Sequence, residues 1–171
     1  MNHSAGKIDL GINQSESKIM HIDLNSCFAT IEQQARQHWR GQPVGVVAYD
    51  SPGGIILAAS YEAKRLGISL GTRVWEAKKI CPNIHITTVD PPKYRKAHQL
   101  FREVLEDYTS RVKAKSIDEF VLDLSDSRAL KSGQTMQQIG YEIKQRVYQH
   151  VGEAVSCNVG IGPNRFLAKL A

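Results

Sequence analysis

Two alternating stretches joined by a short connection constrain the fold most. Residues 111–115 and 120–124 each alternate apolar and polar side chains, which is the pattern of a half-buried β-strand. The connection, residues 116–119, is short enough for a hairpin. Its last two residues, Asp118 and Glu119, place adjacent carboxylates at the turn or at the head of the second strand. Such an acidic pair is usually a solvated turn, so its meaning depends on the rest of the chain.

A second stretch matches the acidic pair. The apolar run over residues 19–24 predicts a buried strand, and Asp23 lies near its end, directly before a predicted helix. Asp23 could therefore meet Asp118 and Glu119 across a small sheet. Three carboxylates suit Mg²⁺, which binds a few carboxylates together with substrate phosphates, and two such ions assist an in-line phosphoryl displacement. We expect the three side chains to lie close enough to share metal ions.

Composition limits the class of protein. The length of 171 residues predicts one domain, or one domain with a small insert. No apolar run approaches the roughly 20 residues of a membrane span, and the first 18 residues lack the apolar segment of a signal peptide. The three cysteines have no metal-like spacing and fit reduced thiols. These features predict a cytoplasmic protein that does not enter a membrane.

The positive charge is unevenly distributed. The formal net charge is +5, and residues 61–96 carry eight Lys and Arg against three acids. A local basic surface suggests a polyanionic partner. A solvated helical face would give the same composition, so charge alone leaves both interpretations open.

The order of the elements predicts an α+β fold. Residues 1–17 are expected to form a flexible arm, and His21, on an apolar strand, is expected in the core. Strands are predicted at 18–24, 44–49, 55–59, 84–89, 111–115, 120–124 and 154–161, and helices at 26–39, 61–65, 72–81, 91–110, 135–151 and from 165. This order indicates an antiparallel sheet with helices on one face, a ferredoxin-like βαββαβ core, as in the palm of polymerases and cyclases. Residues 41–82 form an insert.

Five stretches, in this order, resemble the signature stretches of Y-family translesion DNA polymerases, the bacterial polymerase IV/UmuC-like group. They are DLNSCFA at 23–29, ASYEAK at 59–64, EAKK at 76–79, SIDE at 116–119 and RFLAK at 165–169. The resemblance covers residues 18–171. It implies a palm formed by residues 18–40 and 83–171, with residues 41–82 as a small fingers subdomain.

The resemblance also implies a metal site. Asp23, Asp118 and Glu119 would hold two Mg²⁺ ions, with Mn²⁺ as an alternative, and the backbone carbonyl of Leu24 would be a further ligand. Glu119 would lie on the catalytic side of the acidic pair. The ions would align the primer 3′-hydroxyl with the α-phosphate of the incoming dNTP.

The remaining implied roles concern the nucleotide. The ring of Phe28 would lie beneath the sugar as a steric gate that excludes a 2′-hydroxyl group. Tyr61, Lys64 and Arg165 would contact the triphosphate, since a phenol hydroxyl and cationic groups are suitable partners for phosphate oxygens. Position 64 carries Lys where many family members carry Arg, so the bidentate contact of a guanidinium is lost there.

The resulting prediction is the catalytic core of an error-prone translesion DNA polymerase that acts on primer-template DNA in damage tolerance and repair. The sequence ends at Ala171 within a predicted helix, and family members continue into thumb and little-finger domains, so we expect a fragment. Most of the DNA grip, and any contact with a sliding clamp, would belong to regions outside this sequence. Whether the fragment is active alone is left open.

Two alternatives remain at this stage. A nucleotidyl cyclase can also use a βαββαβ palm and two metal ions, but it does not predict the basic insert at residues 41–82. A non-catalytic accessory protein with a polymerase-like fold usually has an incomplete set of carboxylates. All three are present here.

Overall fold

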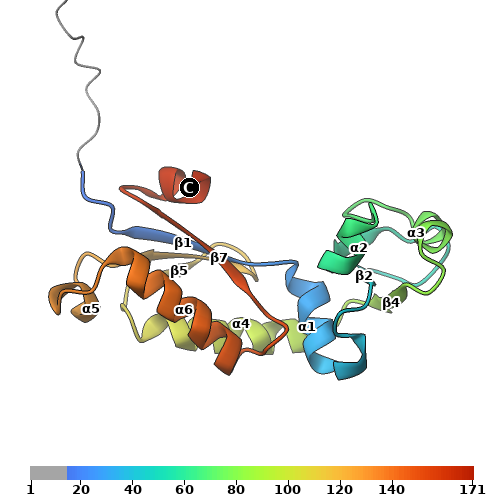
Figure 1. Cartoon of the computed structure of the whole chain (residues 1–171), viewed down its shortest axis with the longest axis horizontal. Coiled ribbons are helices and arrows are strands. Elements are labelled where there is room, and N and C mark those ends of the chain that lie inside the picture. The colour runs from blue at the N-terminus through green and yellow to red at the C-terminus, as the bar shows by residue number, and fades with distance from the viewer. Residues whose placement is uncertain (1–14) are drawn as a thin grey trace, which may run out of the picture.

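The computed structural model describes residues 15–171, so most of the expected N-terminal arm lies outside the described residues. Two sheets of different size lie side by side along the long axis of the molecule (Figure 1). Within the described part of the chain, no helix is both long and apolar enough to cross a bilayer.

The larger sheet has four antiparallel strands in the order β5-β6-β1-β7. They are β1 (Ile19–Leu24), β5 (Val112–Ala114), β6 (Glu119–Asp123) and β7 (Cys157–Gly162). Neighbouring side chains of a strand point to opposite faces. Met20 and Ile22 are therefore fully buried on one face, while His21 and Asp23 point to the other. The predicted hairpin is present as β5 and β6.

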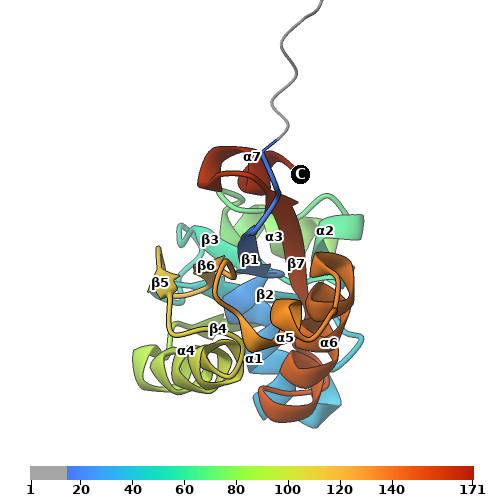
Figure 2. The same ribbon diagram turned by 90° about the vertical axis from the view of Figure 1, so that its left-hand side faces the viewer.

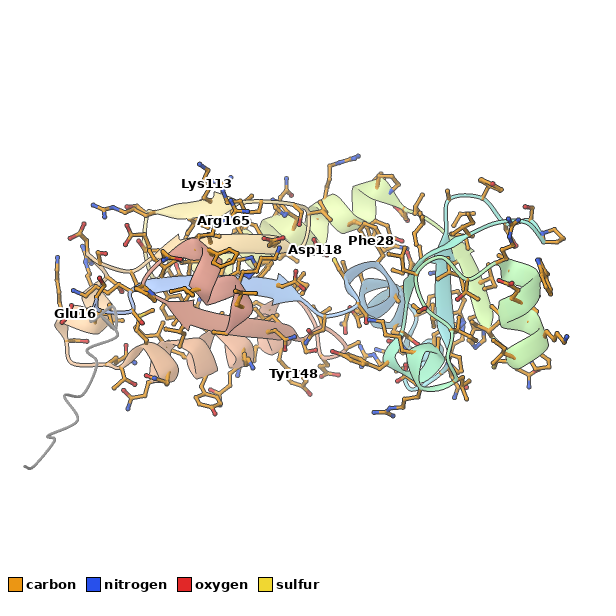
Figure 3. All side chains as sticks on the ribbon, turned by 90° about the horizontal axis from the view of Figure 1, so that it is seen from above. Glu16, Phe28, Lys113, Asp118, Tyr148 and Arg165 are labelled. Atoms are coloured by element: carbon orange, nitrogen blue, oxygen red, sulfur yellow. The ribbon has the colours of Figure 1, made fainter. Side chains whose placement is uncertain are left out.

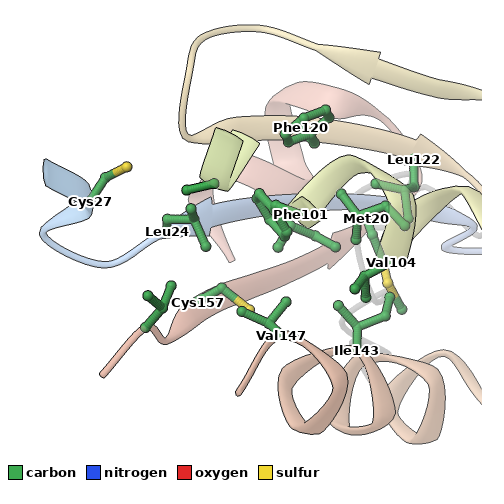
Figure 4. Close-up of a cluster of buried hydrophobic side chains, with 14 of the residues drawn as sticks. Met20, Leu24, Cys27, Phe101, Val104, Phe120, Leu122, Ile143, Val147 and Cys157 are labelled. Carbon is green, nitrogen blue, oxygen red and sulfur yellow. The ribbon is translucent and has the colours of Figure 1, made fainter. Parts of the chain in front are cut away.

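Helices cover the apolar face of this sheet (Figures 1 and 2). They are α4 (Pro91–Glu106) and α6 (Met136–His150), while α1 (Cys27–Ala35) lies beside α4 and packs mainly against the second sheet. Asp90 caps α4 by accepting a hydrogen bond from the Lys93 amide, and Thr135 forms a capping box at the start of α6. Phe101 of α4 and Phe120 of β6, both fully buried, pack edge to face with ring centroids 5.0 Å apart (Figure 4).

The second sheet has three strands in the order β3-β2-β4. They are β2 (Val44–Val47), β3 (Ile56–Ala59) and β4 (His85–Thr88), and the helices α2 (Tyr61–Arg65) and α3 (Val74–Ile80) accompany them. The strand β4 runs parallel to β2. The predicted boundary between fingers and palm, between residues 82 and 83, divides this sheet, because β4 follows that boundary. The exact division of the chain into palm and fingers stays a prediction.

Three local expectations differ from the structure. The first helix ends at Ala35, because Arg36 is extended, and a separate 3₁₀ turn follows at Gln37–Trp39. A one-turn helix, α5 (Arg128–Lys131), lies between the predicted strand at 120–124 and the predicted helix at 135–151, where the sequence predicts no element. The last helix, α7 (Arg165–Leu170), is an exception to the expected arrangement of helices on one face, because it lies on the face of the larger sheet opposite α4 and α6 (Figure 1).

Glycines allow α7 to lie directly on β7. A Cβ atom at Gly160 would lie 1.9 Å from the carbonyl oxygen of Ala168, and one at Gly162 would lie 2.6 Å from the Ala168 amide nitrogen. Backbone therefore approaches backbone without intervening side chains. This contact fixes α7 above the polar face of β1 and β7, next to Asp23.

Candidate active site

Strand register brings the predicted carboxylates to one end of the larger sheet. Asp23 of β1 lies directly opposite Glu119 of β6, and cross-strand partners project from the same face. The Leu24 amide donates a hydrogen bond of 2.9 Å to the backbone carbonyl of Asp118. The Asp118 carboxylate accepts a hydrogen bond from the Ser116 hydroxyl. The hairpin turn is therefore anchored beside the end of β1 (Figure 3 labels Asp118).

Asp23 has an unfavourable environment for an ionised carboxylate. Partial burial raises the pKa of Asp23, and the nearby negative charges of Asp118 and Glu119 raise it further. A bound cation would remove this repulsion. The electrostatics of the three groups are therefore those of a site that favours positive charge.

Two cationic or hydrogen-bonding groups already contact Glu119. Nε2 of His21 lies 2.5 Å from Glu119 Oε1 and donates a hydrogen bond to it. Nζ of Lys169 lies 3.1 Å and 3.2 Å from the two carboxylate oxygens. The hydrogen bond from His21 and then that from Lys169 lower the pKa of Glu119 despite its burial. Glu119 is thus ionised and held in place by β1 and α7.

The carboxylates fit a divalent metal by chemistry, but they are not assembled as a closed site. Among residues 15–171, no three His, Cys, Asp or Glu side chains are arranged around one point as metal ligands. Asp23, Asp118 and Glu119 are therefore not positioned as common ligands of one ion in this structure. Asp23 lines an open cavity of about 400 Å³ between α7 and the sheet, together with His21, Lys144 and Lys169. Space and negative charge for a cation are present, and the ligand assignment, including the Leu24 carbonyl, stays a prediction.

Phe28 lies on the first turn of α1, close in sequence to Asp23. Between β1 and α1, Ser26 adopts a left-handed conformation with φ of 48°, which is uncommon for a residue other than glycine and turns the chain sharply. The ring of Phe28 stacks on that of Tyr94, with centroids 4.4 Å apart and planes inclined by 16°. One face of Phe28 is thereby supported from α4, and the side chain remains partly exposed (Figure 3).

The predicted triphosphate contacts come from two separate elements. Ser60 caps α2 and so fixes the start of the helix that carries Tyr61 and Lys64. Nζ of Lys64 donates a hydrogen bond of 2.7 Å to the Ser26 hydroxyl, which brings α2 to the turn that precedes Phe28. Arg165 is exposed at the start of α7 (Figure 3). The structure therefore brings Lys64 to the β1–α1 turn and leaves Arg165 above the sheet.

Sequence reasoning missed three residues of this site. His21 is buried as expected, with an exposed fraction of 6%, but it also contacts Glu119. Lys169 belongs to the RFLAK stretch and lies four residues after Arg165, one helical turn further on, yet only Arg165 received a role. Tyr94, which supports Phe28, had no signal beyond its position in the first turn of a predicted helix. The spacing of Arg165 and Lys169 on one helix face could have identified the second cation.

A model of the impB/mucB/samB family matches residues 22–171. The chain belongs to this family. A DNA polymerase IV from Alkalilimnicola ehrlichii is 34% identical over 157 residues, covering 92% of this chain and 43% of the relative. A DNA polymerase IV from Acetivibrio thermocellus is 36% identical over 153 residues, covering 89% and 37%. The chain thus spans about two fifths of the length of these relatives.

Solved structures agree with the family assignment. The crystal structure of DinB from Sulfolobus solfataricus is 27% identical, with a TM-score of 0.76 over 89% of this chain and 44% of that protein. An insertion ternary complex of Dbh DNA polymerase is 25% identical, with a TM-score of 0.78 over 89% and 44%. The resemblance to Y-family polymerases and the α+β palm-like fold are therefore confirmed. These matches give no support to the cyclase or the accessory protein.

Proposed function

We propose that this chain is the catalytic core of an error-prone translesion DNA polymerase, which adds dNTPs to a primer 3′-hydroxyl on a DNA template in damage tolerance. The register that sets Asp23 opposite Glu119, with Asp118 anchored beside them, is the observation that carries the proposal. Its support is that an acidic group of this kind lies in a chain whose relatives are named DNA polymerase IV. A cytoplasmic location accords with this role.

The carboxylates would hold two divalent ions, Mg²⁺ or Mn²⁺, with the Leu24 carbonyl as a further ligand. Bound ions would supply positive charge at the 3′-hydroxyl, the α-phosphate and the leaving pyrophosphate. The raised pKa of Asp23 supports this assignment, because burial and two negative neighbours disfavour its charge until a cation is present. Lys169 would turn from Glu119 toward substrate phosphate once Glu119 is engaged by metal.

The nucleotide would lie between the two sheets. Phe28, supported from behind by Tyr94, would exclude the 2′-hydroxyl of a ribonucleotide. Tyr61 and Lys64 would approach the triphosphate from α2, and Arg165 from α7. The contact of Lys64 with Ser26 supports this arrangement, because it places a cation at the turn before Phe28.

Primer-template DNA and dNTP are the proposed partners, and contact with a sliding clamp would come through regions outside this sequence. Few of the cationic side chains on and next to α2 and α3 could reach DNA phosphates at the same time. The exposed candidates are Lys64, Arg65, Arg73, Lys78 and Lys79. Because phosphate contacts dominate DNA affinity, we expect this chain to bind primer-template weakly.

Primer extension with single dNTPs tests the proposal, on the 171-residue chain and on the complete gene product. Asp23→Asn should abolish extension and weaken Mn²⁺ binding measured by calorimetry. The matched control is Asp123→Asn, a carboxylate on the same face at the opposite end of the β1–β6 pair, and it should leave both unchanged. A folded wild-type gene product that extends no primer with Mg²⁺ or Mn²⁺ would contradict the proposal.

A further inference from the structure

A fully buried carboxylate lies directly behind the proposed sugar site. Glu32 of α1 has no exposed surface, although glutamate is almost never fully buried unless it is paired. Its side chain takes part in none of the contacts around Asp23, Asp118 or Glu119. The burial of a charge at this position therefore needs a separate explanation.

Three donors satisfy the Glu32 carboxylate. Nζ of Lys93 lies 3.0 Å and 2.9 Å from its two oxygens. The hydroxyl of Tyr94 donates a hydrogen bond of 2.9 Å to Oε1, and the guanidinium of Arg36 pairs with Oε2. Lys93 is itself held by Asp90, 3.2 Å away. Hydrogen bonds to an ionised acceptor are strong and directional, so the Tyr94 hydroxyl has a defined position.

The same tyrosine connects this network to Phe28. The two rings stack at 4.4 Å and 16°, and Tyr94 has an exposed fraction of only 3%. Phe28 and Glu32 are four residues apart on α1, so they lie on one face of the helix. That face packs on the first turn of α4, which supplies both Lys93 and Tyr94. The ring behind Phe28 is thus fixed at its hydroxyl by Glu32 and at its face by Phe28.

We propose that Glu32 is a positioning residue for sugar discrimination, which holds the Tyr94 ring and thereby the Phe28 ring in place. A ring excludes a 2′-hydroxyl only if it cannot yield, and a displacement of about 1 Å is enough to change a reaction rate strongly. The inference rests on the proposed function, since it concerns the same nucleotide site. The buried carboxylate would thus do more than pack: by holding the Tyr94 hydroxyl, it would restrict the movement of the stacked Tyr94 and Phe28 rings.

If Glu32 only stabilised the fold, removal of its hydrogen bond to Tyr94 would not change sugar discrimination. A second tyrosine–glutamate pair in the chain serves as the control. Tyr108 donates a hydrogen bond of 2.8 Å to Glu142, and Tyr108 is also buried, with an exposed fraction of 7%. This second tyrosine–glutamate pair joins the end of α4 to α6, and its tyrosine stacks on no ring of the nucleotide site. Tyr108→Phe therefore removes a tyrosine–glutamate hydrogen bond of similar length, though a less buried one, without disturbing Phe28.

The test compares Glu32→Gln, Tyr94→Phe and Tyr108→Phe in the complete gene product. The first readout is the ratio of kcat/KM for a dNTP to that for the matching NTP. We expect this ratio to fall by about tenfold, equivalent to about 1.4 kcal/mol, in Glu32→Gln and in Tyr94→Phe, and to stay unchanged in Tyr108→Phe. Tyr94→Phe keeps the ring and removes only the hydroxyl, so it serves even if Glu32→Gln does not fold.

The second readout does not require activity. The Tyr94 ring shifts the proton resonances of Phe28, and this readout uses the 171-residue chain, which has only four phenylalanines to assign. Nuclear magnetic resonance should show this ring-current shift reduced in Tyr94→Phe and Glu32→Gln and retained in Tyr108→Phe. An unchanged shift in a folded Tyr94→Phe, or a displaced ring with unchanged sugar discrimination, overturns the inference. A wild-type protein that incorporates no nucleotide would refute the proposed function, while the resonance measurement would still decide whether Glu32 positions Phe28.

Discussion

Replacing Gly160 by alanine should separate α7 from the larger sheet and disturb the site through Lys169. The new Cβ would lie 1.9 Å from the Ala168 carbonyl oxygen, and real Cβ contacts almost never fall below 3.0 Å. The obstacle is backbone, so no change of rotamer relieves it. The helix has to move by about 1 Å, or β7 has to bend by as much.

Two magnitudes follow from this clash. Overpacking of this kind costs typically about 1–3 kcal/mol, which lowers the melting temperature by roughly 2–4 °C per kcal/mol in a protein of this size. Lys169 follows Ala168 directly, and its Nζ is only 3.1 Å from Glu119. A shift of about 1 Å breaks this contact, and misplacement by that distance can lower activity by about a hundredfold.

Thermal unfolding followed by circular dichroism measures the first effect, and single-nucleotide primer extension measures the second. Gly53→Ala is the control, because a Cβ there meets nothing within 4 Å, and it should leave both quantities unchanged. A Gly160→Ala protein that melts and extends primers as the wild type does would show that α7 is not held by this contact, and the reasoning would be wrong.

Four further outcomes are expected. Phe28→Ala should raise NTP incorporation about tenfold or more relative to dNTP incorporation, which an unchanged ratio in extension assays would contradict. Asp23→Asn should raise the melting temperature of the metal-free chain at pH 7, because a carboxyl group whose pKa is raised by folding destabilises the folded state when it is ionised. The difference in melting temperature between variant and wild type should vanish as the pH falls through the pKa of Asp23 and the wild-type group is protonated. Phe101→Ala should reduce the free energy of unfolding by about 3–5 kcal/mol in urea titrations, since the ring is fully buried. DNA affinity measured by fluorescence anisotropy should fall as salt rises, and the slope of log affinity against log salt should be about −0.9 for each phosphate contacted. An affinity that does not change with salt would exclude the basic surface as the contact.

The strands of the larger sheet were predictable from local pattern. Alternation alone separates Met20 and Ile22 from His21 and Asp23, whereas the position of Asp23 opposite Glu119 comes from the pairing of β1 with β6. These relations depend on the two-residue period of a strand, which a sequence displays directly. The face of the sheet on which Asp23 and Glu119 lie was therefore predictable, and their joint role as metal ligands stays a prediction.

Contacts between distant segments were not predictable in the same way. His21 and Lys169 are 98 and 50 residues away from Glu119 along the chain, and no local period encodes such distances. The pairing of β4 with β2 was not evident for the same reason, because a short apolar run does not specify which strand it pairs with. The burial of Glu32 was not predictable either, because a glutamate is almost never fully buried unless it is paired, and its partners Lys93 and Tyr94 lie far along the chain.

The two hydrophobic clusters give the described part of the chain two levels of local stability. The larger cluster contains 22 buried residues and the smaller, formed by the second sheet with α2, α3 and their connections, contains eight. Regions with fewer buried contacts open more readily than the rest of a protein, so amide protons of β3 and α2 should exchange with solvent faster than those of β1 and β6. Tyr61 and Lys64 are carried by the less protected part, whereas Asp23 and Glu119 lie on the more protected one. Local opening of α2 would then release the proposed triphosphate contacts of Tyr61 and Lys64 repeatedly, while Asp23 and Glu119 keep their positions in the paired strands β1 and β6.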